Sequence, residues 1–316
     1  MAKQFPEKKL NKTTLMRFMT LLTLLLLLFP RSSKPQTSRQ ETNRYLNQVP
    51  PGDTPKVFAP EVISLKNRYE FGSVFSKDGK EFYYGIEGKQ RPHIEFIRYK
   101  DNKWSEPEKL LISDKYGYND PFLSPDEKKL FFISDQAIDG KGDKKDIDIW
   151  YIKREKSGWS QPINAGKEIN SVNNEYYISF TKEGKMYYSS NKQAGDVKSN
   201  KYDIYYSAPT RTGFQPSEKL NSAINTEHYE ADVFVSPNED YMIYCAERPD
   251  GYGRGDLFIS FKDEKGQWKE AKNMSNVINT PGYEFCPFVT ADGRYLFFSR
   301  DGDIYWVDAK VIDKLR

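Results

Sequence analysis

The 316-residue chain is poor in the side chains that most often carry chemistry. It has two cysteines, Cys245 and Cys286, and two histidines, His93 and His228. Two cysteines cannot make a zinc site of the CxxC type, and two widely separated histidines exclude a multi-histidine metal site. The sequence also lacks a G-x-S-x-G nucleophile elbow and a G-x-x-x-x-G-K-[ST] phosphate-binding loop. We therefore expect no bound metal and no cofactor.

An excess of basic charge is missing too, once the N-terminus is set aside. The first 40 residues hold eight Lys/Arg and one acid, which leaves the rest with 40 basic and 44 acidic residues. A slightly acidic body has no electrostatic footprint for the phosphate backbone. Nucleic-acid binding is disfavoured.

The N-terminus contains the one long apolar run of the chain. Five Lys/Arg residues precede "FMTLLTLLLLLF" at 18–29. A basic start followed by twelve apolar residues is typical of an export signal and short for a spanning helix, which needs about 20. We predict a signal peptide or N-terminal membrane anchor at 1–30, both of which fit. The Pro-, Ser-, Thr- and Gln-rich stretch at 31–56 is predicted to be a linker.

The remaining residues contain one β-hairpin pattern five times. The copies are "YEFGSVFSKDGKEFYYG" (69–85), "YNDPFLSPDEKKLFFIS" (118–134), "NEYYISFTKEGKMYYSS" (174–190), "YEADVFVSPNEDYMIY" (229–244) and "YEFCPFVTADGRYLFFS" (283–299). Aligned on the turn, Gly79, Glu127, Gly184, Glu239 and Gly293 are equivalent. Alternating apolar residues on both sides of a short polar turn predict two antiparallel strands.

A second module follows the hairpins, as in "DIDIWYIKREKSGWSQPINAGKEIN" (146–170) and "YDIYYSAPTRTGFQPSEKLNSAIN" (202–225). It predicts two more strands, and four strands in a repeat of about 50 residues are typical of a propeller blade. The fifth copy lacks its fourth strand, whereas residues 57–66 resemble the missing piece. We therefore predict an all-β fold at 57–316: a five-bladed β-propeller of four-stranded antiparallel blades, whose ring is closed by an N-terminal strand.

The turns "FSKDG", "LSPDE", "FTKEG", "VSPNE" and "VTADG" resemble the Pro-Asp-type, WD-like repeats of TolB-like exported bacterial proteins. The "DIYYS" segments that end in Ile-Asn resemble a variant of these repeats found in bacterial envelope proteins. The resemblance covers 57–316 and implies a propeller that serves as a scaffold or binding module. Two departures are that only two turns carry Ser-Pro and that five repeats are visible where such propellers usually have more.

Acidic residues at the start of the innermost strands are the candidate ligand-binding residues. Glu70, Glu175, Glu230 and Glu284 share one position of the repeat, which predicts either a ring of carboxylates at the channel mouth or a structural cap on the loop between blades. Two positions on, Asp120 and Asp232 replace Gly72, Tyr177 and Cys286. Strand alternation predicts that Glu230 and Asp232 share the channel side. Because the two aspartates occur in only two blades, they are the stronger functional candidates.

The two cysteines are expected in neighbouring blades, near one face of the ring. This layout permits a disulfide between Cys245 and Cys286 but does not require it.

These observations predict an exported, non-catalytic binding or scaffold module for a protein, peptide or glycan of the cell envelope. We expect a monomer outside the cytoplasm that meets the membrane only through its N-terminal segment. The alternative is a carbohydrate-active hydrolase with Glu230, Asp232, Asp120 and Glu70 as its acids, because glycoside hydrolysis needs two carboxylates and a propeller can supply them from different blades.

Overall fold

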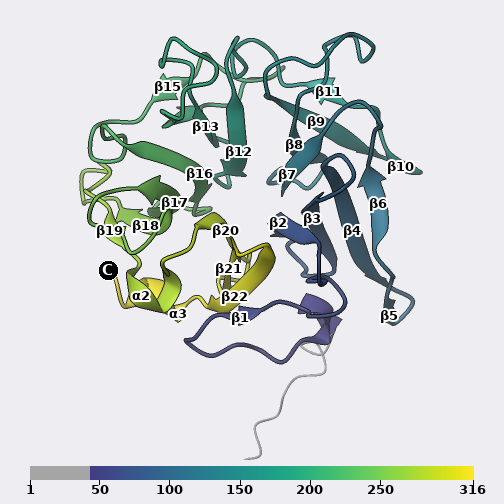
Figure 1. Cartoon of the computed structure of the whole chain (residues 1–316), viewed down its shortest axis with the longest axis horizontal. Coiled ribbons are helices and arrows are strands. Elements are labelled where there is room, and N and C mark those ends of the chain that lie inside the picture. Colours follow the sequence, from purple (N-terminus) through teal and green to yellow (C-terminus); the bar gives the residue numbers. More distant parts are fainter. Residues whose placement is uncertain (1–42) are drawn as a thin grey trace, which may run out of the picture. The chain divides into compact units, whose positions relative to one another are not determined.

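The computed structural model describes residues 43–316, which form one compact unit. Its strands make five separate antiparallel sheets arranged around a centre, which is the predicted five-bladed propeller (Figure 1). The innermost strands β2, β7, β12, β16 and β20 surround the centre (Figure 1). The predicted export segment at 1–30 lies outside the described residues. None of the helices within 43–316 is long and apolar enough to cross a membrane.

The blades follow the chain in order, each with its strands running outward from the centre. Blade one has β2 (Tyr69–Phe75), β3 (Glu81–Glu87), β4 (His93–Lys100), β5 (Lys103–Trp104) and β6 (Glu108–Leu111). Blade two has β7 (Tyr118–Leu123), β8 (Lys129–Ser134), β9 (Asp148–Glu155), β10 (Gly158–Trp159) and β11 (Ile163–Asn164). Blade three has β12 (Glu175–Phe180), β13 (Met186–Ser190), β14 (Asp203–Ser207) and β15 (Glu218–Lys219).

Blade four has β16 (Tyr229–Val235), β17 (Tyr241–Glu247), β18 (Asp256–Phe261) and β19 (Lys272–Asn273). Blade five has β20 (Glu284–Val289), β21 (Tyr295–Arg300), β22 (Asp303–Asp308) and β1 (Lys56–Val57). Three short helical segments complete the described chain: η2 (Tyr45–Asn47), α2 (Ser275–Ile278) and α3 (Lys310–Asp313).

The hairpin turns form as the repeat predicts. Each turn begins with a Ser or Thr whose hydroxyl accepts a backbone N–H, as Ser76 does from Glu81 at 2.9 Å. The five equivalent residues have positive φ, between 56° and 88°: Gly79, Glu127, Gly184, Glu239 and Gly293. These turns lie together on one side of the ring, which we call the turn face. The innermost strands begin on the opposite side, which we call the mouth face.

In blades two to four, the asparagine of the Ile-Asn motif holds the third strand. Asn225 accepts a hydrogen bond from the N–H of Ile204 at 2.7 Å and donates one to its carbonyl oxygen at 2.9 Å. Asn170 and Asn279 do the same for Ile149 and Leu257. The amide side chain thus forms with the third strand the pair of hydrogen bonds that a neighbouring strand would otherwise form.

The N-terminal strand closes the ring, but it is shorter than predicted. β1 covers Lys56–Val57 and pairs antiparallel with Trp306 and Tyr305 of β22. After β1, Phe58 turns fully into the core between blades five and one. Its ring centroid lies 5.0 Å from that of Phe297, 5.2 Å from Trp306 and 5.2 Å from Phe82.

The predicted linker at 31–56 lies partly outside the described residues, and its described part, from Asn43, belongs to the propeller unit. Tyr45 is buried between Phe75 of blade one and Tyr295 of blade five, and its hydroxyl donates a 2.7 Å hydrogen bond to Asp292. Residues 43–58 therefore join the first and last blades at two points, through Tyr45 and through Phe58.

We expect Phe58→Ala to lower the free energy of unfolding by about 3–5 kcal/mol, because it leaves a cavity at the seam of the ring. Urea unfolding monitored by tryptophan fluorescence measures this. Val49→Ala, in the same segment but 82% exposed, is the control and should change stability by less than about 0.5 kcal/mol. A loss below about 1 kcal/mol for Phe58→Ala would show that this contact does not close the ring.

Candidate functional site at the channel mouth

One irregularity recurs in the innermost strand of every blade. The strand pairing skips at one place in β2, β7, β12, β16 and β20, which marks a β-bulge. The first residue after the last regular pair has a left-handed φ between 44° and 52°, and the five are Gly72, Asp120, Tyr177, Asp232 and Cys286. A bulge interrupts the alternation of side chains. The residues before and after it therefore do not share faces as a regular strand predicts.

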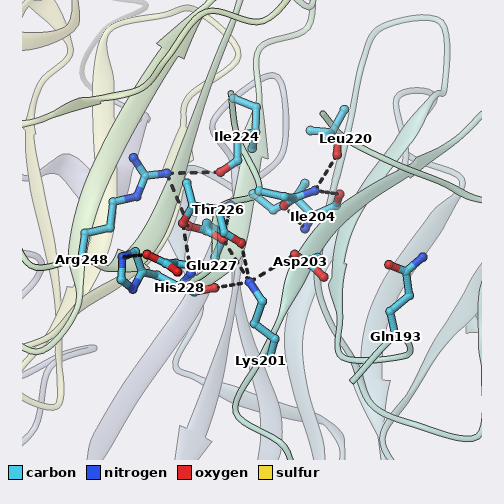
Figure 2. A network of polar contacts seen from close by, with 12 residues as sticks. Gln193, Lys201, Asp203, Ile204, Leu220, Ile224, Thr226, Glu227, His228 and Arg248 are labelled. Atoms are coloured by element: carbon cyan, nitrogen blue, oxygen red, sulfur yellow. Dashed lines mark hydrogen bonds and ion pairs between the residues drawn. The ribbon is translucent and has the colours of Figure 1, made fainter. Parts of the chain in front are cut away.

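Glu230 and Asp232 show the consequence, and the prediction that they share the channel side is wrong. Glu230 lies in a polar network with Thr226, Lys201 and Arg248 at the junction of blades three and four, part of which Figure 2 shows. Asp232 is close instead to Cys286, from whose backbone it receives a hydrogen bond.

The repeated glutamates cap the loops that enter their blades. Glu284 accepts hydrogen bonds from the N–H of Thr280 at 3.0 Å and from its hydroxyl at 2.6 Å, and it pairs with Arg300 at 2.9 Å. Glu230 makes the same contacts with Thr226 and Arg248. Glu175 accepts the corresponding hydrogen bonds from the N–H and the hydroxyl of Ser171. All three are fully buried, which raises the pKa of each carboxyl, to about 7 for Glu175, against the lowering by their hydrogen bonds. These contacts describe a loop-capping role in blades three to five.

Glu70 departs from this pattern. Its Oε1 binds Arg68 and accepts a 3.4 Å bond from the N–H of Leu65, but its buried Oε2 has no hydrogen-bond partner among the described residues. Blade one has Lys66 where the other loops have Ser171, Thr226 and Thr280, so the capping hydroxyl is absent. Burial, which outweighs the opposing effect of Arg68, raises the pKa of Glu70 to about 7.

Asp120 and Asp232 lie inside the channel rather than at its surface, with 6% and 8% of their area exposed. Oδ1 of Asp120 lies 3.8 Å from Sγ of Cys286. A Cβ at Gly72 would lie only 2.6 Å from the same oxygen, so blade one needs glycine there. Burial raises the pKa of Asp232 to about 7, and burial together with the charge of Asp232 raises that of Asp120 well above its ordinary value.

Aromatic side chains meet within the channel beyond the two aspartates and, on the turn face, border a hollow of about 370 Å³. The hydroxyl of Tyr177 in blade three donates a 2.8 Å hydrogen bond to the carbonyl oxygen of Pro287 in blade five. Nearer the turn face, the ring of Phe288 lies 5.9 Å from that of Phe122 and 6.0 Å from that of Phe234. Side chains from opposite blades thus meet across the centre.

Both cysteines are free and fully buried, so the disulfide that the layout permitted is not formed. Cys245 lies in β17 opposite Ala231 of β16, whereas Cys286 occupies the bulge of β20. Burial raises the pKa of each thiol well above its ordinary value, which keeps both protonated and unreactive.

The mouth face is lined by aromatic side chains, which the sequence reasoning missed. They flank the repeated glutamates, as the strings "YEF", "EYY" and "YEA" could have shown. Tyr69 is 59% exposed, and the half-buried members are Phe71, Tyr176, Tyr229, Tyr283 and Phe285. The ring centroids of Tyr283 and Phe285 lie 5.4 Å apart, and the ring of Tyr176 stacks on that of the buried Tyr202 at 5.0 Å. We call these residues the aromatic rim.

Of the hollows beside the aromatic rim, two are lined by more than one of its members. The first, of about 520 Å³, lies at the junction of blades one and five and is lined by Tyr69, Glu70, Phe71, Glu87, Arg254, Tyr283, Phe285, Asp301 and Gly302. The second, of about 650 Å³, spans blades two to four, where Lys145, Asp146 and Lys198 join Tyr176, Tyr202 and Tyr229. Of the predicted acids, the structure brings only Glu70 to a hollow of the mouth face described here.

No protein-family model matches the chain, and no curated protein matches it. Among solved structures it is similar to TolB from Acinetobacter baumannii (TM-score 0.48, 15% identity, 75% of this chain and 53% of that chain). It is also similar to a putative TolB from Agrobacterium tumefaciens (0.46, 15%, 74% and 71%) and to a thermostable family-43 glycoside hydrolase (0.48, 14%, 76% and 88%). The chain spans about half the length of the first. These likenesses concern the fold alone.

The buried acid pair makes stability depend on pH. Because the pKa of Asp232 rises from 3.8 to about 7 on folding, the folded protein keeps a proton that the unfolded chain releases between these values. Stability therefore falls as the pH rises through this window and levels off above it. We expect Asp232→Asn to be more stable than the unsubstituted protein at pH 8, by up to about 4 kcal/mol, and little different at pH 4.

Urea unfolding at pH 4, 6 and 8 measures this difference. Glu227→Gln, whose carboxylate is exposed on the same face, should leave the profile unchanged. An Asp232→Asn protein that is less stable than the unsubstituted one at pH 8 would contradict a raised pKa of the buried Asp232 carboxyl.

Proposed function

We propose that this propeller is a non-catalytic binding module of the cell envelope, which holds a protein or peptide on its mouth face. The observation that carries the proposal is the aromatic rim with its two flanking hollows. The basic start and apolar run of residues 1–29 support a place outside the cytoplasm. We also propose that its repeats are of the Pro-Asp, WD-like type.

Half-exposed aromatic side chains support binding because they bury a large apolar area at little cost in side-chain entropy. Such residues are enriched among those that dominate binding energy at interfaces. Here they come from four of the five blades: Tyr69 and Phe71, Tyr176, Tyr229, and Tyr283 with Phe285. A surface gathered from four rigid blades needs little rearrangement to accept a partner.

Charged side chains in both hollows favour a protein or peptide over a neutral glycan. Glu87, Asp301 and Arg254 border the first hollow, and Lys145, Asp146 and Lys198 border the second. Charges of both signs beside apolar rings suit a polypeptide, which offers both kinds of group within a few residues.

The hydrolase alternative has less support from the geometry. Glycoside hydrolysis requires two carboxylates that reach opposite sides of one glycosidic bond. Asp120 and Asp232 are almost wholly buried, and Glu230 is fully buried within its loop cap. A sugar ring would have to displace core side chains to reach them.

Site-specific photocrosslinking of the full chain in its native host tests the proposal. We expect a benzoylphenylalanine at Tyr69 or Tyr229 to give discrete protein adducts, because both lie on the aromatic rim. Lys182, an exposed position on the turn face, is the matched control and should give none of these adducts. Adducts from Lys182 alone, or none from the rim positions, would contradict the proposal.

A further inference from the structure

The hollow on the turn face is walled by apolar side chains from all five blades and has a volume of about 370 Å³. The rings of Phe122, Phe234 and Phe288 meet at its inner end. Protein interiors are packed as closely as crystals of small molecules, so an apolar space of this size at the centre of a ring is exceptional.

The repeat explains why this space is open. Aligned on the turns, blades two, four and five have a phenylalanine at one level of the channel, namely Phe122, Phe234 and Phe288. Blade one has Val74 at the equivalent position. Blade three has Ser179, whose hydroxyl is bonded to the backbone of blade four. Two of the five side chains are therefore too small to fill the centre.

The entrance to the hollow is framed by the same residue of each hairpin turn: Lys77, Pro125, Lys182, Pro237 and Ala291. Three of these five have no polar side chain. The ammonium group of Lys77 donates a hydrogen bond to the carbonyl oxygen of Pro125, and that of Lys182 donates one to Oδ1 of Asn238 at 3.0 Å. Both cations are thus held by a neighbouring turn.

The acids at the entrance have partners too. Glu127 accepts a hydrogen bond from the backbone N–H of Lys77, and Asp292 accepts one from Tyr45 at 2.7 Å and one from Arg44 at 3.1 Å. Two lysines and two acids line the hollow, so their formal charges cancel. Within the described chain, no lining residue has a buried polar side-chain atom that lacks a hydrogen-bond partner. The hollow therefore matches a ligand without charge.

We propose that this hollow binds a small, neutral, apolar molecule. A dry apolar cavity of about 150 Å³ accepts benzene, so the hollow has room for a molecule of about two aromatic rings. Water on these apolar walls finds few hydrogen-bond partners, and an apolar ligand that displaces such water gains affinity. This inference goes beyond the proposed function, because the partner is held on the mouth face and this ligand on the turn face.

Fluorescence titration of the full chain with Prodan tests the proposal. Prodan is a neutral naphthalene dye whose emission shifts to the blue in an apolar site. We expect saturable binding that naphthalene displaces. Naphthalene-2-sulfonate should displace Prodan about tenfold less effectively or worse, because its charge must be stripped of water without gaining a partner.

Two variants locate the binding site. Val74→Phe gives blade one the side chain of three other blades and fills the hollow, and Ala291→Trp covers the entrance from an exposed position. Each should weaken Prodan binding by about tenfold or more, because the added ring takes the space of the ligand. Glu183→Trp adds the same indole ring to an exposed turn residue that does not line the hollow, and its affinity should match that of the unsubstituted protein.

Circular dichroism confirms that each variant is folded, and Ala291→Trp keeps the test decisive if Val74→Phe disturbs the core. Three results would overturn the proposal. They are the absence of saturable Prodan binding, an unchanged affinity in Ala291→Trp, and equal displacement by naphthalene and its sulfonate.

Discussion

The bulge in the innermost strand of each blade is the constraint on which the rest of the structure depends. It places one residue with left-handed φ at the same height in all five blades, from Gly72 to Cys286. In each innermost strand, side chains that precede the bulge contact the loops or lie on the mouth face, and side chains that follow it line the channel. The bulge therefore separates the buried acid pair from the loop-capping glutamates and the aromatic rim.

The repeat is imperfect at the first of its glutamates. In blades three to five the glutamate is saturated by a Ser or Thr four residues earlier, and in blade two Tyr118 takes its place. Blade one combines Glu70 with Lys66, and it also receives the closing segment with Phe58. The ring seam is therefore where the architecture leaves a buried carboxylate oxygen without a hydrogen-bond partner among the described residues. The asymmetry among the repeated glutamates arises here from the loss of a structural partner.

Much of this fold could be predicted from the sequence, because each step rested on local chemistry. The turns follow from Ser or Thr before a residue that accepts left-handed φ, and the strands follow from alternation. Ring closure followed from counting a missing strand, although Lys56–Val57 is shorter than the 57–66 expected.

The candidate site was less predictable, since the bulge has no consistent sequence mark. Glycine suits a left-handed φ, but Asp120, Tyr177, Asp232 and Cys286 adopt it because the packing of the channel imposes it. Strict alternation across that position predicts that Glu230 and Asp232 lie on the same side of the strand, which is wrong. The aromatic residues beside the glutamates were missed for the same reason, because the exposure of these aromatic side chains depends on the position of the bulge.

The central claim is that the repeated glutamate is a structural cap in blades three to five and is released from that role in blade one. Urea unfolding of Glu284→Gln and Glu70→Gln at pH 8 tests this most directly. We expect Glu284→Gln to lose about 2–3 kcal/mol, because it breaks a buried, fully paired carboxylate. Glu70→Gln should cost less than Glu284→Gln, because Oε2 of Glu70 has no partner among the described residues and only its contacts with Arg68 and the N–H of Leu65 are weakened. Equal losses in the two variants would contradict the account.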